Sequence, residues 1–190
     1  FLNKNNIISI FPGSRDQEIK RKLHIMLKAA EKYSGMNICV AAAPNLDVHF
    51  FKHYQKDFPQ VQFVFGQTYE LLQESEMAIV TSGTATLETA LFRVPQVVCY
   101  KSSFISYSIA RLLVNIKFIS LVNLIMDKEI VKELIQNHCS VENIQAEIDL
   151  ILYQVNYREE MISKYDELIT IIGEQGCSEK IAQDLIKQYI

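Results

Sequence analysis

The chain has 190 residues, and its 19 Lys+Arg against 22 Asp+Glu give a formal net charge of −3. Hydrophobic residues make up 49% and charged residues 22%, which excludes disorder and low complexity and predicts a folded domain with its own core. A slightly acidic chain without a basic block also excludes a nucleic-acid partner held by phosphate neutralisation.

The first hundred residues alternate short apolar runs with helical patterns. The apolar runs, which predict strands, cover residues 7–11, 38–42, 62–66, 77–80 and 97–100. Near-continuous apolar strands separated by helices are typical of a parallel sheet that is covered on both faces. Because crossovers between parallel strands are right-handed, the predicted fold class is α/β, a doubly wound parallel sheet.

The pattern changes after residue 100. Residues 120–124 predict one more short strand, and only helices are predicted from residue 128 onward. These helices cover residues 129–136, 141–153, 157–172 and 178–190. We therefore expect an α/β domain over residues 1–138 and a C-terminal helical extension over 139–190, which packs on that domain or on a partner domain.

Several protein classes are disfavoured. The most apolar stretch, residues 104–126, contains two basic residues and predicts a core segment with some membrane contact rather than a span. The four cysteines lie far apart, which predicts buried thiols rather than a disulfide framework. His49 and His53 lack a third ligand, so no metal is expected. A start at Phe1 predicts no signal peptide and a piece of a longer protein.

The first candidate site is the stretch Phe11-Pro12-Gly13-Ser14-Arg15, between a predicted strand and a predicted helix. Ligands bind at the carboxyl ends of the strands in an open parallel sheet, so this turn belongs on the ligand side. Gly13 permits a tight turn, Ser14 can cap the helix, and Arg15 adds donors suited to phosphate oxygens. The alternative is a capped turn with a solvent-facing arginine.

A second strand-to-helix turn contains Ser82, Gly83 and Thr84, a small polar cradle that favours an anion. Glu88 lies four residues after Thr84, on the same face of the predicted helix. A carboxylate at this position can accept hydrogen bonds from a ribose diol. The alternative is that Glu88 is an ordinary solvated helix residue. Two such turns in one sheet favour a nucleotide or sugar-nucleotide site. Asn123, at an expected strand end, is a weaker candidate for contact with a base or sugar.

Together these stretches resemble the C-terminal half of lipid-A-disaccharide synthase, a glycosyltransferase family of the GT-B type. The blocks that carry the resemblance are FPGSR at 11–15 with EI at 18–19, TSGTATLE at 81–88, PQVVCYK at 95–101, SYSIA at 106–110, LLV at 112–114, SLVNLI at 120–125 and VKELIQ at 131–136. They run in the family's order, and the resemblance implies the Rossmann-like half of a GT-B fold.

The resemblance also implies a reaction. The family transfers 2,3-diacylglucosamine from its UDP derivative to 2,3-diacylglucosamine 1-phosphate (lipid X), which gives lipid A disaccharide 1-phosphate and UDP in lipid A biosynthesis, without a metal or cofactor. The residues implied to face the donor diphosphate are Gly13, Ser14, Arg15, Ser82, Gly83 and Thr84. Glu88 would hold the ribose hydroxyls, Asn123 would frame the uridine, and Arg15 would stabilise the leaving group.

Further expectations follow from the resemblance. The acceptor and the general base would belong to an N-terminal domain, so the isolated chain is expected to be inactive. The implied location is cytoplasmic and peripheral to the inner membrane of a Gram-negative bacterium, and the implied partners are that membrane surface and a second copy of the chain. Two alternatives stay open: an enzyme like UDP-N-acetylglucosamine 2-epimerase, which the blocks from Tyr100 to Asn123 do not fit, and a non-catalytic nucleotide-binding module.

Overall fold

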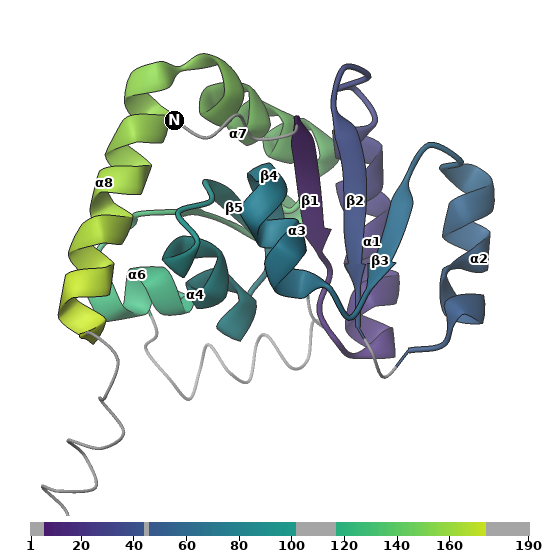
Figure 1. Ribbon diagram of the computed structural model, residues 1–190, viewed down its shortest axis with the longest axis horizontal. Coiled ribbons are helices and arrows are strands. Elements are labelled where there is room, and N and C mark those ends of the chain that lie inside the picture. The colour runs from purple at the N-terminus through teal and green to yellow at the C-terminus, as the bar shows by residue number, and fades with distance from the viewer. Residues whose placement is uncertain (1–5, 44–45, 102–116, 174–190) are drawn as a thin grey trace, which may run out of the picture.

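A six-stranded parallel sheet forms the centre of the protein, in a computed structural model that describes residues 6–43, 46–101 and 117–173 (Figure 1). Its strands are β1 (Ile7–Phe11), β2 (Asn37–Ala42), β3 (Gln62–Phe65), β4 (Ser75–Thr81), β5 (Gln96–Tyr100) and β6 (Lys132–Ile135). They lie in the order β3-β2-β1-β4-β5-β6, and every neighbouring pair is parallel. The prediction of a doubly wound α/β sheet is therefore confirmed.

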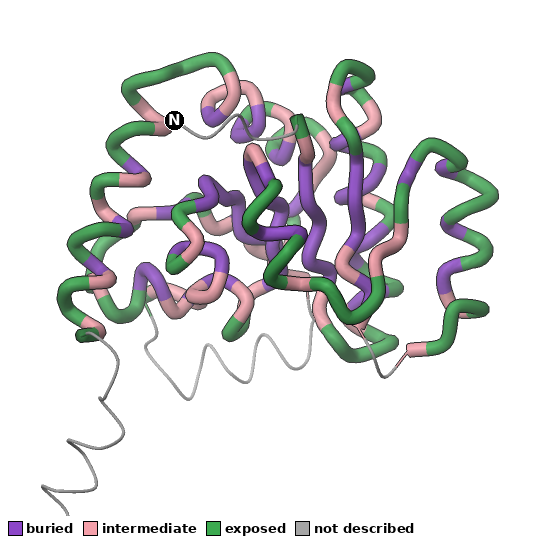
Figure 2. The backbone as a smooth tube through the Cα atoms, viewed as in Figure 1, coloured by how far each residue is buried: buried purple, intermediate pink, exposed green. Residues whose placement is uncertain are grey.

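Helices cover both faces of the sheet. They are α1 (Asp16–Ala30), α2 (Val48–Asp57), α3 (Thr68–Glu74), α4 (Thr84–Leu91), α6 (Leu121–Met126), α7 (Val141–Tyr153) and α8 (Val155–Ile172), with a short 3₁₀ helix, η1 (Gln136–His138). The central strands are almost wholly buried, whereas the helices keep an exposed outer face (Figure 2). Burial on two faces explains why β1, β2, β4 and β5 read as apolar runs rather than as alternating patterns, whereas the edge strand β3 is only partly buried.

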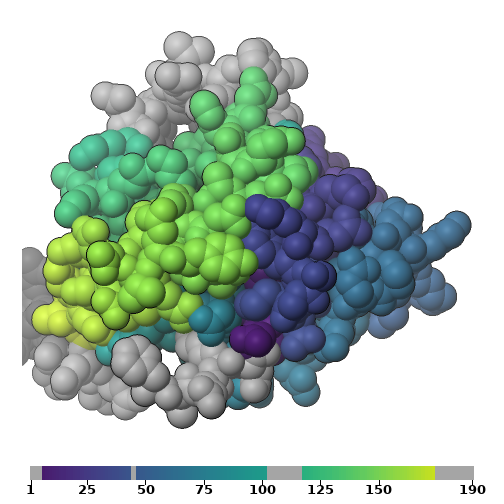
Figure 3. Space-filling view, turned by 90° about the horizontal axis from the view of Figure 1, so that it is seen from above, coloured from purple at the N-terminus to yellow at the C-terminus, as the bar shows by residue number. Residues whose placement is uncertain are grey.

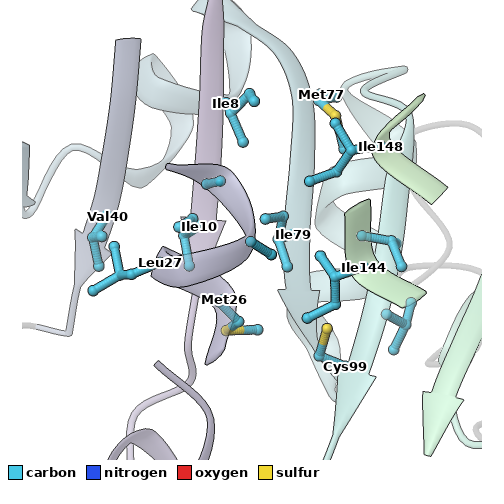
Figure 4. Close-up of a cluster of buried hydrophobic side chains, with 14 of the residues drawn as sticks. Ile8, Ile10, Met26, Leu27, Val40, Met77, Ile79, Cys99, Ile144 and Ile148 are labelled. Carbon is cyan, nitrogen blue, oxygen red and sulfur yellow. The ribbon is translucent and has the colours of Figure 1, made fainter. Parts of the chain in front are cut away.

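The larger core lies between the sheet and the helices α1 and α7. In this core Ile10 of β1 and Ile79 of β4 lie close to Leu27 of α1 and Ile144 of α7 (Figure 4). A smaller core on the other face packs residues of α3 against the sheet: Phe11, Cys39, Leu71, Leu72, Ala78, Val80 and Val94. Both cores hold the carboxyl ends of β1 and β4 rigidly beside each other.

The chain changes its winding direction between β1 and β4. It runs from β1 outward through β2 to β3, returns to β4 on the other side of β1, and continues outward to β5 and β6. Phe11 and Val80 are paired in the register of the two central strands, so the turns that follow them leave the sheet side by side. Such a switch point is where open α/β sheets bind their ligands.

Two predicted elements are wrong. Residues 120–124, predicted as a strand, form the start of helix α6, which Ser120 caps by accepting a hydrogen bond from the backbone N–H of Asn123. Residues 129–136, predicted as a helix, contain the edge strand β6, which pairs with β5. Both segments are short, and residues 129–136 mix apolar with charged residues, so pairing and packing with the rest of the chain decide their type.

The C-terminal helices pack on the α/β part. The hydroxyl of Tyr33 donates to the carbonyl of Gln145 at 2.9 Å and to Asp149 at 2.7 Å, which joins the end of α1 to α7. Helix α8 contacts α4 and α6, and in the view from above the green surface of α7 continues into the yellow-green surface of α8 (Figure 3). Helices α7 and α8 confirm the predicted helices at 141–153 and 157–172, whereas the one at 178–190 lies outside the described residues, as does most of the apolar stretch 104–126.

The cysteines and the helices bear on two further expectations. Cys39, Cys99 and Cys139 are buried free thiols, as predicted, and Cys177 lies outside the described residues. Across the described ranges, no helix combines the length and the apolar character that crossing a membrane requires.

A candidate anion-binding cleft at the switch point

Seven of the eight predicted site residues line one cleft of about 600 Å³ at the carboxyl ends of β1 and β4. They are Gly13, Ser14, Arg15, Ser82, Gly83, Thr84 and Glu88. The strand β1 ends at the lower edge of the sheet in Figure 1, and the turn that follows it supplies Gly13, Ser14 and Arg15 to the cleft. Residues separated by about seventy positions in the sequence are therefore brought to one ligand-sized space.

The two turns of the cleft are fastened to each other. The hydroxyl of Thr81, at the end of β4, donates to the carbonyl of Pro12, after β1, at 3.0 Å. Gly13 has φ +101°, which favours glycine, and a Cβ atom built on it would lie 3.5 Å from Cγ2 of Thr81. The turns thus form one continuous rim on the same side of the sheet.

The N-terminus of α4 is the most favourable anion position in the cleft. Gly83 occupies its N-cap with φ +146°, and a Cβ atom built there would contact nothing within 4 Å. The first turn of α4 carries no acidic residue. Because the first-turn N–H groups of a helix lack partners inside the helix and carry partial positive charge, this end attracts a phosphate.

The N-terminus of α1 is different. Arg15 occupies its N-cap without a side-chain cap, so the helix begins one residue later than capping by Ser14 requires. Asp16 and Glu18 already place negative charge in its first turn, which complements the helix dipole. The group that could bind an anion here is the guanidinium of Arg15. It pairs with the carboxylate of Glu18 at 3.1 Å, and the arginine side chain is still 81% exposed. Arg15 therefore keeps donors for an incoming anion.

Ser82 and Glu88 complete the described walls of the cleft. The hydroxyl of Ser82 donates to the carbonyl of Ile119 at 2.7 Å, so its only hydrogen is used inside the protein. A phosphate at this turn would therefore meet backbone N–H groups rather than the serine hydroxyl as donors. Glu88, one helical turn beyond Thr84, lies half-buried in the cleft wall and offers acceptors to a hydroxylated ligand.

Asn123 does not belong to the cleft, in contrast to the prediction. It is fully buried in α6, where its amide nitrogen donates to the carbonyl of Val131 at 2.8 Å and to Glu133 at 2.9 Å. Its amide oxygen accepts from the backbone N–H groups of Ile130 and Val131 at 2.7 and 3.0 Å. Since an amide has two donor hydrogens and two acceptor positions, Asn123 has none left for a uridine.

The sequence reasoning did not assign three polar side chains of the cleft to the site, Glu18, Thr68 and Thr81. Glu18 follows Arg15 by three residues, a spacing that brings two side chains together on a helix and could have indicated their ion pair. Thr68 begins α3 directly after β3, so the rule that found the other turns, that ligands bind where strands end, also applied here.

The chemistry of the cleft suits binding of an anionic, hydroxylated ligand. It combines a helix N-terminus, a guanidinium and a carboxylate on one rim. Within the three described ranges, no group of three or more His, Cys, Asp or Glu side chains could hold a metal ion.

Comparison with known proteins gives the family. A family model described as Lipid-A-disaccharide synthetase matches residues 2–185. The chain is 37% identical over 185 residues to the lipid-A-disaccharide synthase of Anaeromyxobacter dehalogenans strain 2CP-1, covering 94% of this chain and 48% of the relative. It is 38% identical over 182 residues to that of Syntrophus aciditrophicus, covering 92% and 47%. The chain thus spans about half the length of the curated relatives it matches.

Solved structures show the same architecture at low sequence identity. A UDP-GlcNAc 2-epimerase from Neisseria meningitidis, bound to UDP-GlcNAc, has a TM-score of 0.61 at 18% identity, covering 97% of this chain and 45% of the other. The calicheamicin glycosyltransferase CalG4 has a TM-score of 0.63 at 13% identity, covering 98% and 42%. These similarities confirm that the fold is that of one half of a GT-B protein.

Proposed function

The chain belongs to the lipid-A-disaccharide synthase family, and from this premise we propose that it is the donor-binding half of a glycosyltransferase. The whole protein would transfer 2,3-diacylglucosamine from its UDP derivative to lipid X, giving lipid A disaccharide 1-phosphate and UDP. Residues 1–138 would form the donor-binding unit and residues 139–190 its helical extension. Because both substrates carry acyl chains, the reaction would take place at the cytoplasmic surface of the inner membrane. In a dimer, the two copies of the chain would exchange their helical extensions.

The observation that carries the proposal is the shared rim of the two turns. The diphosphate of the donor would lie at the N-terminus of α4, where no acidic residue opposes it, with the guanidinium of Arg15 reaching it from the start of α1. Glu88, on the same cleft wall, would accept hydrogen bonds from the ribose hydroxyls. Asn123 has no part in this arrangement because its amide is used inside the protein.

The proposed role of this half is support of the departing UDP. Negative charge develops on the diphosphate as the bond to the sugar breaks, and donors already in place lower that barrier most. The base that activates the acceptor hydroxyl, and most of the contacts to the acceptor, would come from outside this chain. This half of the protein would therefore accelerate the reaction by binding the donor and by stabilising the negative charge on the departing UDP.

A binding experiment tests the ribose contact. We expect the chain to bind UDP more tightly than 2′-deoxy-UDP in isothermal titration calorimetry, because the deoxy compound removes one donor to Glu88. Glu88→Gln leaves a neutral acceptor in place of the carboxylate, so it should weaken UDP binding by about tenfold and reduce the preference between the two nucleotides. The exposed Glu159→Gln is the matched control. A Glu88→Gln protein with the wild-type preference would contradict the assignment.

A transfer experiment separates the remaining functions. The full-length protein, given radiolabelled lipid X and the UDP-sugar, should form labelled disaccharide 1-phosphate. Epimerisation of UDP-N-acetylglucosamine without transfer would support the epimerase alternative, and UDP binding without either reaction would support a nucleotide-binding module.

A further inference from the structure

A second pocket adjoins the cleft on the side of β5. It measures about 580 Å³ and shares four residues with the cleft, namely Arg15, Glu18, Thr81 and Ser82. We call it the basic pocket. The residues that line it without lining the cleft are Asp16, Gln17, Arg21, Lys22, Tyr100 and Lys101.

The basic pocket carries an excess of positive charge. Four cationic side chains line it, and its two carboxylates are already engaged. Glu18 pairs with Arg15 at 3.1 Å, and Asp16 pairs at 3.0 Å with Lys20, which lies outside the pocket. The charges of Arg21, Lys22 and Lys101 are therefore left for a ligand.

Lys22 is the unusual member of this group. It is only 1% exposed, although lysine is almost never buried without a partner, and no hydrogen bond or ion pair of its ammonium group is found within the described residues. Burial lowers the pKa of Lys22 below its ordinary 10.5, with the nearby charge of Glu18 acting in the opposite direction. Burying the ammonium group of Lys22 costs free energy, because the charge loses its hydration. An anion that enters the pocket and pairs with this group would offset that cost.

Sequence spacing explains why these side chains meet. Arg15, Glu18 and Lys22 follow one another at intervals of three and four residues, so they project from the same face of α1 toward the carboxyl ends of the strands. Lys101 comes from the end of β5, the strand next to β4. Two separate elements thus direct positive charge into one space beside the cleft.

We propose that the basic pocket binds a second phosphate group, distinct from the donor diphosphate, and that this group is the phosphomonoester of the acceptor. The proposal rests on the proposed function, in which the acceptor carries a 1-phosphate. Because the pocket and the cleft share a wall, an acceptor anchored here by its phosphate has its sugar ring beside the donor. Lys22 and Lys101 then select phosphorylated over unphosphorylated acceptors.

The test compares two acceptors in the full-length protein, assayed in non-ionic detergent so that no phospholipid is present. The acceptors are lipid X and the same diacylglucosamine without its 1-phosphate. Lys22→Met and Lys101→Gln should each raise the KM for lipid X about tenfold, as expected for loss of one charge-assisted hydrogen bond. The KM for the unphosphorylated acceptor and for the UDP-sugar should not change. Lys28→Met, on the exposed side of α1, is the matched control.

Other outcomes overturn the proposal. A raised KM for the UDP-sugar alone would assign the pocket to the donor, and equal changes for both acceptors would show that it does not recognise the phosphate. Urea unfolding of Lys22→Met, in which an apolar chain of similar length replaces the lysine, checks that the variant is folded.

If the wild-type protein transferred sugar to neither acceptor, that result would contradict the proposed function and not the phosphate site. Direct measurement of phosphate binding tests the basic pocket in that case. With UDP saturating the cleft, inorganic phosphate should still bind to the 190-residue chain, observed as broadening of its ³¹P resonance. Lys22→Met should abolish the broadening. Absence of binding to the wild-type chain under these conditions would overturn the second phosphate site.

Discussion

Arg15 is the side chain on which the chemistry of the proposed site depends most. It lines both the cleft and the basic pocket, and its ion pair with Glu18 orients it without burying it. Removing a preorganised donor to developing charge lowers kcat by about 10²–10³-fold in known enzymes. We expect Arg15→Ala to lower kcat of the full-length protein in this range while the KM for the donor changes less. Steady-state kinetics with radiolabelled lipid X would measure both.

Arg93→Ala is the control for this change, since Arg93 is also exposed and also held by a carboxylate, Asp166, at 2.6 Å. It lies outside the cleft, so kinetics should be unchanged. If Arg15→Ala raised the donor KM and left kcat intact, Arg15 would bind the ground state of the donor only, and its role in leaving-group departure would be rejected.

Asn123 is important for stability rather than for binding. Its four hydrogen bonds connect α6 to the start of β6, and Asn123→Ala would remove the partners of the backbone groups of Ile130 and Val131, while Glu133 would keep its bonds to the segment before α6. We expect the free energy of unfolding in urea to fall by about 2–4 kcal/mol, since buried groups lose their partners. The exposed Asn156→Ala should change it by less than about 0.5 kcal/mol.

The same variant tests the correction made to the site. Well below its unfolding midpoint, Asn123→Ala should bind UDP with wild-type affinity in calorimetry. Loss of UDP binding with unchanged stability would restore the role in uridine recognition that the sequence indicated for Asn123.

At the scale of elements, we expect the contact between α7 and α8 to depend on pH through Glu147. The hydroxyl of Tyr157 donates to Glu147, and burial raises the pKa of this carboxyl above its ordinary 4.5, with the tyrosine hydrogen bond acting in the opposite direction. A raised pKa in the folded state means that the folded protein holds the proton more tightly than the unfolded chain. Glu147 therefore costs stability as the pH rises above about 4.5 through the folded-state pKa.

Glu147→Gln removes this cost while keeping an acceptor for Tyr157. We expect its free energy of unfolding to match the wild type near pH 4 and to exceed it increasingly toward pH 7, in urea titrations at several pH values. Glu159→Gln, exposed on α8, should show no such divergence. A constant difference at all pH values would show that Glu147 is not the titrating group.

The strands and helices differ in how well the sequence alone predicts them. The strands β1, β2, β4 and β5 were predictable because burial between helices requires apolar residues on both of their faces, and the partly buried edge strand β3 was found from its short run of aromatic and β-branched residues. The strand β6 and the helix α6 were not, because segments of four to six residues are too short for their pattern to distinguish a strand from a helix. Their types are decided by pairing with β5 and by the bonds around Asn123, both of which join residues outside the local window.

The candidate site divides in the same way. The two turns could be placed because strand ends and glycine positions are local features, and parallel topology brings them together. The burial of Lys22 and the engagement of the Ser82 hydroxyl with Ile119 could not, because each depends on a distant segment that packs against it. Packing of this kind leaves no local signal in the sequence.

At the scale of the molecule, the chain corresponds to about half of its relatives' length. We expect the 190-residue chain to bind UDP and to form no disaccharide, because the proposed acceptor base lies outside it. The measurement is radiolabel transfer by the chain and by the full-length protein at equal concentration. Product formed by the chain alone would show that this half contains the base, and would redirect attention to Glu18 and Glu88 of the cleft.

The hydrogen bond from Thr81 to Pro12 has a further consequence for the energetics of recognition. This bond joins the two turns of the cleft in the absence of a ligand, so the backbone of the turns would lose little conformational entropy when a ligand binds. If the donor binds here as proposed, it would meet binding groups that are already in position, and its affinity would come mainly from its contacts with them. The half that grips the donor would then need no closure of its own, and any large movement of the enzyme would belong to the approach of the acceptor.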